Sequence, residues 1–112
     1  MTNIIKVKDG VEFTTIAAGG FRMLAAFVTV ADKLGQDLTI TSACDGEHSG
    51  PDDPHHHGLA YDIRSHDLVD KDRVLQAIIS ELGTDQFYAF LESPDSDNEH
   101  IHCQLRHGII YP

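Results

Sequence analysis

Basic residues are scarce in this 112-residue sequence, in which 8 Lys and Arg stand against 18 Asp and Glu for a formal charge of −10. No cluster of cations could neutralise a row of phosphates, so nucleic acid and an anionic membrane surface are excluded as first-choice partners. The sequence also lacks any apolar run near the roughly 18 residues of a membrane span. The first ten residues carry Lys6 and Lys8 but no apolar segment, so we expect no signal peptide.

Cysteine is rare as well, and tryptophan is absent. Cys44 and Cys103 lie far apart and form no Cys-x-x-Cys motif, so we expect buried free thiols rather than a disulfide framework. Internal repeats and low-complexity linkers are missing, and 41% of the residues are hydrophobic. We therefore expect one domain over residues 1–112, with a single core and a monomeric state.

The spacing of apolar residues predicts an α+β fold, a small antiparallel sheet flanked by two helices. Two segments repeat apolar residues at helical spacing, and each ends at a glycine. Four others alternate in the manner of strands. The predicted helices are 20–34, ending at Gly35, and 70–82, with Asp70 as N-cap and Gly83 at its end; the predicted strands are 38–43, 58–64, 87–91 and 101–105. The last strand places His102 and Gln104 on one face and Cys103 on the other.

Histidine, in contrast, is abundant, with 8 residues gathered mainly in two places. One group lies in the loop before the second predicted strand, and the other lies near the last strand: His48, His55, His56 and His57, then His100, His102 and His107. Histidine is the commonest protein ligand of metals, which makes a metal site the leading interpretation. Acidic residues in the same loop also permit calcium, but their spacing does not match an EF-hand loop, and imidazoles favour zinc.

Three residues are the strongest candidates for holding Zn²⁺. His55 and Asp62 are separated by six residues that include Gly58, so the chain can turn back tightly and bring both side chains to one point. If His102 projects from a neighbouring strand, the three converge as His, Asp and His. A catalytic zinc site commonly has three protein ligands and leaves a fourth position for water.

A carboxylate near the last histidine supplies a candidate general base. Glu99 lies three residues before His102, close enough to reach a zinc-activated water without being a ligand. Glu92, at the end of the preceding predicted strand, is the rival carboxylate. Together these groups predict a metal-assisted hydrolase.

Two linked motifs carry a resemblance to a known family. The first is His55-x-x-Gly58-x-Ala60-x-Asp62, and the second is Glu99-x-x-His102 some forty residues later. Their order resembles the paired signature of the zinc D-Ala-D-Ala carboxypeptidase and L-alanyl-D-glutamate endopeptidase family, which also includes many phage endolysins. The resemblance covers roughly residues 38–105 and implies a fold of the hedgehog/DD-peptidase type.

The resemblance implies that His55, Asp62 and His102 hold Zn²⁺ and that Glu99 is the general base. The implied substrate is a peptidoglycan stem peptide or another peptide containing D-amino acids. Members often carry an Arg after the strand preceding the first motif, but this chain has no basic residue between Asp37 and Arg64. His48 and Arg64 are the candidates to replace it, and His100, which alternation places on the same face as His102, is a further candidate substrate contact. The implied location is the host cytoplasm before release, or a phage particle.

Two alternatives remain open at this level. The missing arginine and the absence of tryptophan leave room for a metal-stabilised structural or binding domain of a phage particle, without efficient catalysis. A zinc hydrolase that acts on an amide outside the cell wall is a third interpretation.

Overall fold

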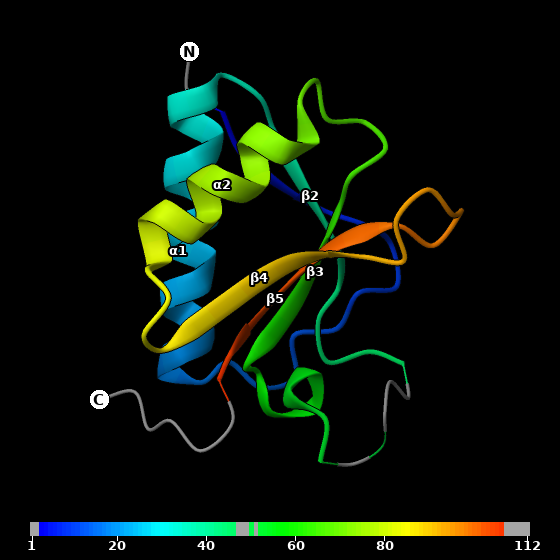
Figure 1. Ribbon diagram of the computed structural model, residues 1–112. Coiled ribbons are helices and arrows are strands. Elements are labelled where there is room, and N and C mark those ends of the chain that lie inside the picture. Colours follow the sequence, from blue (N-terminus) through cyan, green and yellow to red (C-terminus); the bar gives the residue numbers. More distant parts are fainter. Residues whose placement is uncertain (1–2, 47–49, 51, 107–112) are drawn as a thin grey trace.

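The computed structural model describes residues 3–46, 50 and 52–106 as an α+β fold with two helices and a five-stranded sheet (Figure 1). The helices are α1 (Ala18–Leu34) and α2 (Lys71–Leu82), and a short 3₁₀ helix, η1, covers Pro54–His57. The strands are β1 (Ile5–Val7), β2 (Leu38–Ser42), β3 (Ala60–Arg64), β4 (Phe87–Glu92) and β5 (His100–Leu105), in the sheet order β1-β2-β3-β5-β4.

The sheet is mixed, so the prediction of a purely antiparallel sheet is wrong in one strand. β1 runs parallel to β2, with Ile5 opposite Leu38, while the other neighbouring pairs are antiparallel. The sequence pattern missed β1 because this strand has three residues, of which Lys6 and Val7 are exposed. A strand this short gives too few alternations to be recognised.

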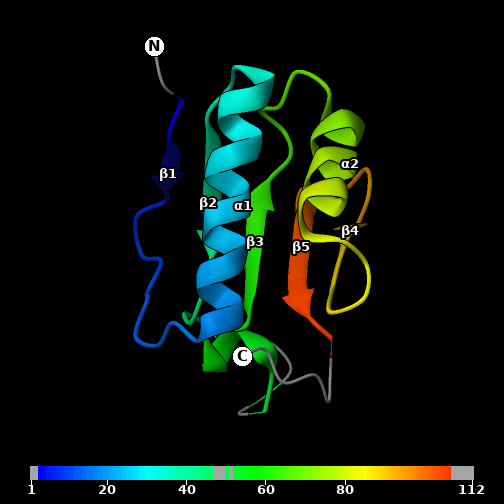
Figure 2. The ribbon, with the colours of Figure 1, turned by 90° about the vertical axis from the view of Figure 1, so that its left-hand side faces the viewer.

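Both helices pack against the same face of the sheet and leave the other face open (Figure 2). The residues at two of the helix ends have the capping roles that their types favour. Gly35 closes α1 in the left-handed conformation, at φ 67°, and its N–H donates to Ala31 O. The Asp70 carboxylate caps α2 by accepting from Arg73 N–H at 3.1 Å. Within the described residues no helix is long and apolar enough to cross a membrane.

Strand alternation separates the core from the open face. On β5, Ile101, Cys103 and Leu105 are buried in the core beneath the helices, as the sequence predicted. Cys44 and Cys103 are both buried free thiols, which confirms that interpretation. His102 and Gln104 alternate with these core residues and therefore lie on the open face, where the candidate site is found.

Candidate metal centre

The polar residues of the open face lie in rows across the three antiparallel strands β3, β5 and β4. Residues directly opposite one another in an antiparallel pair have neighbouring side chains on one face. Two adjacent rows supply most of the site: Asp62, His102 and Phe90 in one, and Arg64, His100 and Glu92 in the next. A carboxylate and two imidazoles are thus fixed on paired strands rather than on loops, which limits their movement.

His55 reaches the same point from η1. The Asp53 carboxylate accepts a hydrogen bond from His55 N–H at 2.9 Å and caps this 3₁₀ helix. Gly58 then reverses the chain in the left-handed conformation, at φ 69°, and leads directly into β3. The turn places His55 Nε2 3.4 Å from Asp62 Oδ1, with both side chains buried.

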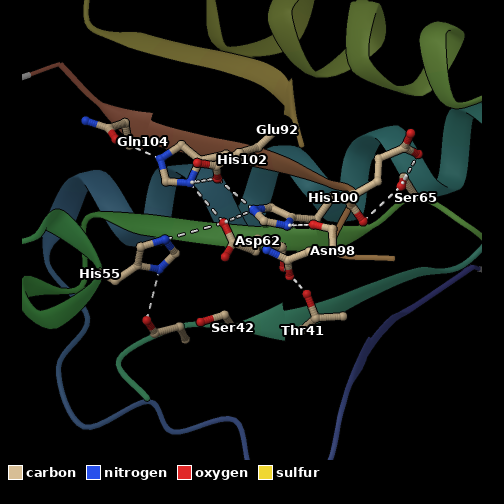
Figure 3. A network of polar contacts seen from close by, with 12 residues as sticks. Thr41, Ser42, His55, Asp62, Ser65, Glu92, Asn98, His100, His102 and Gln104 are labelled. Atoms are coloured by element: carbon tan, nitrogen blue, oxygen red, sulfur yellow. Dashed lines mark hydrogen bonds and ion pairs between the residues drawn. The ribbon is translucent and has the colours of Figure 1, made fainter. Parts of the chain in front are cut away.

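Asp62 is the centre of the cluster (Figure 3). Its Oδ1 atom lies 2.9 Å from His102 Nδ1, 3.4 Å from His55 Nε2 and 3.5 Å from His100 Nε2. Burial opposes ionisation of this carboxyl, but hydrogen bonds with His102 and His55 outweigh burial and hold the pKa of Asp62 well below its ordinary value. The carboxylate is therefore ionised, the form that binds a metal.

Each of the three histidines has its other ring nitrogen beside a protein acceptor. His55 Nδ1 lies 3.0 Å from Ala43 O, His100 Nδ1 lies 2.8 Å from Asn98 O, and His102 Nε2 lies 2.7 Å from Gln104 Oε1. When these nitrogens donate in neutral rings, the other three ring nitrogens, which face Asp62, carry lone pairs that can bind a cation. The hydrogen bonds to Asp62 described above need protons on those nitrogens, and a cation would replace these protons. Outer partners of this kind fix the tautomer and ring orientation of metal-ligating histidines. Three lone pairs beside a carboxylate repel one another unless protons or a cation lie between them.

The three distances measured from Asp62 Oδ1 are close to the separation between neighbouring ligand atoms of one zinc ion. Zinc–ligand distances of about 2.0–2.1 Å place the ligand atoms of a tetrahedron about 3.3–3.4 Å apart. The distances from Asp62 Oδ1 to His55 Nε2 and His100 Nε2, at 3.4 and 3.5 Å, match this edge. His102 Nδ1, at 2.9 Å, needs to move outward by about half an ångström to fit the same tetrahedron.

Glu92 adds a second carboxylate to the cluster. Its Oε1 atom lies 2.7 Å from His100 Nε2 and 3.7 Å from His102 Nδ1. Its side chain is 44% exposed, whereas that of Asp62 is 9% exposed, so Glu92 sits at the solvent side. One ligand atom each from Asp62, Glu92, His100 and His102 lies within 4.8 Å of the others, and this set could hold a metal ion.

Two opposing effects act on the pKa of His102. Burial lowers its pKa, but hydrogen bonds with Asp62 and Gln104 outweigh burial, and the pKa of His102 lies above its ordinary value. An ion on Nδ1 must displace a proton from that atom, so metal binding should release protons and strengthen as the pH rises.

A cavity of about 560 Å³ opens over this cluster. Its lining joins the cluster residues to polar side chains from β2 and from the turn after β4, including Ser42, Ser93 and Asn98. A space of this size accommodates a short peptide.

The structure brings together the three predicted ligands, His55, Asp62 and His102, and adds His100, which the sequence assigned to substrate. His48 lies outside the described residues. Arg64 lies beside His100 in the next row and lines a neighbouring cavity. Gln104, whose acceptor orients His102, was placed on the correct face by alternation, but nothing in the sequence gave it a role.

Glu99, the predicted general base, is not brought to this cluster. Its carboxylate accepts from Ser65 Oγ at 2.6 Å, from Lys71 Nζ at 2.9 Å and from Asp95 N–H at 2.8 Å. Residues three apart on an extended chain point to opposite faces, so the spacing Glu99-x-x-His102 separates the two side chains. Glu92 is the glutamate that the structure places beside His100.

The chain matches no protein-family model, no curated protein and no solved structure.

Proposed function

We propose that this chain is a zinc-dependent peptidase that cleaves peptide bonds in bacterial peptidoglycan, with a fold of the hedgehog/DD-peptidase type. The observation that carries the proposal is the orientation of the three histidines. One ring nitrogen of each histidine lies beside a protein acceptor, which is Ala43 O, Asn98 O or Gln104 Oε1. The other nitrogen of each ring faces Asp62. The cell-wall substrate comes from the resemblance of the two motifs.

The proposed ligands are His55, Asp62 and His102. Zn²⁺, when bound, would lower the pKa of a water molecule and polarise the scissile carbonyl. Two neutral imidazoles and one carboxylate leave the site with a net charge of about +1, which suits the negative charge that develops on the carbonyl oxygen. The open cavity above the cluster gives a peptide access to this face.

We assign the general base to Glu92 rather than Glu99. Glu92 Oε1 accepts the proton that the attacking water loses and returns it to the departing amine nitrogen. His100, at 2.7 Å, keeps this carboxylate over the cavity. The Glu99 carboxylate already accepts hydrogen bonds from an ammonium, a hydroxyl and a backbone N–H. It is therefore not available to take a proton from a water molecule at the cluster.

The experiment compares Glu92→Gln with Glu99→Gln. Zinc content and hydrolysis of purified peptidoglycan, and of acetyl-Lys-D-Ala-D-Ala, are measured for both and for the unmodified chain. The proposal expects Glu92→Gln to keep zinc and lose about 10²- to 10⁴-fold in rate, the usual contribution of a general base. Full activity in Glu92→Gln would show that Glu92 is not the general base. Loss of activity only in Glu99→Gln would show that Glu99 is the general base, as the resemblance to the family implies.

A metal-stabilised domain without catalysis is the second candidate, and one observation favours it. Asp62, Glu92, His100 and His102 can supply four ligand atoms, and structural zinc sites are closed by four protein ligands. The same variant separates the two candidates, because Glu92 is a ligand in the closed site and a base in the open one. Zinc lost from Glu92→Gln, together with no hydrolysis by the unmodified chain, would favour the structural domain.

A further inference from the structure

The cluster on the open face contains more donor atoms than one catalytic zinc ion needs. The set of residues that could hold a metal shares Asp62 and His102 with the proposed zinc ligands. Its two other members, Glu92 and His100, are not among those ligands. Glu92 Oε1 and His100 Nε2 lie 2.7 Å apart, and carboxylate oxygens and imidazole nitrogens are both atoms that zinc binds. These two side chains are therefore a candidate pair of ligands for a further ion.

The surrounding strands hold this pair in position (Figure 3). Glu92 ends β4 and lies opposite His100 on β5, so strand pairing keeps both side chains on the open face. The Asn98 carbonyl oxygen lies 2.8 Å from His100 Nδ1, which leaves Nε2 facing Glu92. Both side chains are partly exposed and line the large cavity, so an ion can reach them from solvent. A bound ion would replace the proton that Oε1 and Nε2 share and would release it to solvent.

The charge of the cavity favours more than one divalent cation. The carboxylates and the one ammonium that line it belong to Asp45, Asp53, Asp62, Glu92 and Lys8. Four negative charges against one positive charge are not neutralised by a single Zn²⁺. The formal charge of the whole chain is −10, which adds to the same field. A second cation is therefore attracted to the cavity after the first has bound.

The pair lies directly beside the proposed zinc position. His100 Nε2 is 3.5 Å from Asp62 Oδ1, and Glu92 Oε1 is 3.7 Å from His102 Nδ1. Two-metal sites of hydrolytic enzymes hold their ions about 3.5–4 Å apart. Two donor sets at this spacing are therefore compatible with two ions bound at the same time.

We propose that Glu92 and His100 bind a second Zn²⁺ and that this ion inhibits hydrolysis. The site rests on the geometry of the pair, whereas the inhibitory role rests on the proposed function. A carboxylate that coordinates a metal does not take a proton from the attacking water, so Glu92 stops acting as the general base. Two protein ligands hold zinc less tightly than three, so the isolated chain should carry the first ion and gain the second as free zinc rises.

The first part of the test is a calorimetric titration, with further Zn²⁺, of protein that already holds one zinc per chain. The unmodified chain should bind one more ion, and Glu92→Gln and His100→Gln should each lose this second binding event. The controls are His57→Ala and Asp97→Asn, which remove an exposed imidazole and an exposed carboxylate outside the pair. Both controls should keep the second ion.

The second part measures hydrolysis of acetyl-Lys-D-Ala-D-Ala at the same concentrations of free zinc. The rate of the unmodified chain should fall in proportion to the fraction of second sites that are filled. At saturation it should approach the rate of Glu92→Gln, about 10²- to 10⁴-fold lower. His100→Gln should show no such fall, whatever its rate at low zinc.

Three results would overturn the inference. They are a titration that ends at one ion per chain, a second ion that both Glu92→Gln and His100→Gln retain, and a bound second ion that leaves the rate of the unmodified chain unchanged. The calorimetric titration needs no turnover, so it decides the second site independently of hydrolysis. An inactive chain that binds the second ion through Glu92 and His100 would contradict the proposed function and confirm the site.

Discussion

The Glu99 carboxylate lies 2.9 Å from the Lys71 ammonium and ties the start of α2 to the residue before β5. Hydrogen bonds from Ser65 Oγ and Asp95 N–H complete its surroundings, and the Glu99 side chain is only 3% exposed. The pair connects the second helix to the turn that carries Asn98, whose carbonyl orients His100. We therefore interpret Glu99 as a residue that positions the turn.

Glu99→Gln should lower the midpoint of thermal unfolding while leaving zinc content unchanged. The substitution removes the charge that Lys71 neutralises and leaves that ammonium without its partner. Glu81→Gln is the control, because Glu81 forms an exposed pair with Lys33 at 3.3 Å. That control should shift the free energy of unfolding by less than about 1 kcal/mol. A Glu99→Gln protein as stable as the unmodified chain would contradict a positioning role.

The contribution of Glu99 should disappear in acid. The hydrogen bond from Ser65, followed by those from Asp95 N–H and Lys71, lowers the pKa of Glu99 from 4.5 to about 2. A carboxyl with a lowered pKa in the folded state stabilises the fold at pH above its unfolded value and loses that contribution as the pH falls. The difference in stability between the unmodified chain and Glu99→Gln should therefore shrink between pH 4.5 and about 2 in urea titrations. A constant difference over this range would contradict the assignment.

Gly58→Ala should destabilise the fold and weaken zinc binding. A Cβ at Gly58 would collide with the backbone of Thr15 and Ala17, so the turn that carries His55 would have to shift. Gly35→Ala is a matched control, because Gly35 has nearly the same φ, 67° against 69°, and its Cβ would meet nothing within 4 Å. The control should lose about 1–2 kcal/mol for the left-handed conformation, and Gly58→Ala about 1–3 kcal/mol more. Equal losses in urea unfolding would contradict the packing argument.

Gln104→Leu should reduce zinc affinity by about 10- to 100-fold, the usual effect of losing an outer partner of a ligand histidine. The leucine removes the acceptor 2.7 Å from His102 Nε2, so the ring loses its fixed orientation. Gln104→Glu retains an acceptor oxygen and should keep most of the affinity. Competition titrations with a zinc chelator measure both variants, and unchanged affinity in Gln104→Leu would show that His102 needs no such partner.

Most of the secondary structure could be predicted because the elements are amphipathic and have clear ends. The helix predicted at 20–34 begins two residues earlier, at Ala18, and Gly35 and Asp70 have the capping roles expected of them. The strand predicted at 101–105 begins at His100, and its faces are as alternation required. The parallel pairing of β1 could not be predicted, since it depends on a distant partner, β2, rather than on local pattern.

The site was harder to predict, because its geometry depends on strand register. The motif spacing indicated His55, Asp62 and His102, but the pairing of Glu92 with His100 comes from the alignment of β4 on β5. Spacing along the chain favoured Glu99, whereas alternation sends Glu99 and His102 to opposite faces. The acceptors that orient His55 and His100 are backbone carbonyls, which residue identity does not reveal.

The most direct test of the metal centre is elemental analysis of protein purified without chelator. We expect about one zinc per chain, with none bound by His102→Ala and normal content in His57→Ala, since His57 is an exposed residue of η1. A chain that binds no zinc, or a His102→Ala variant that retains it, would contradict the account.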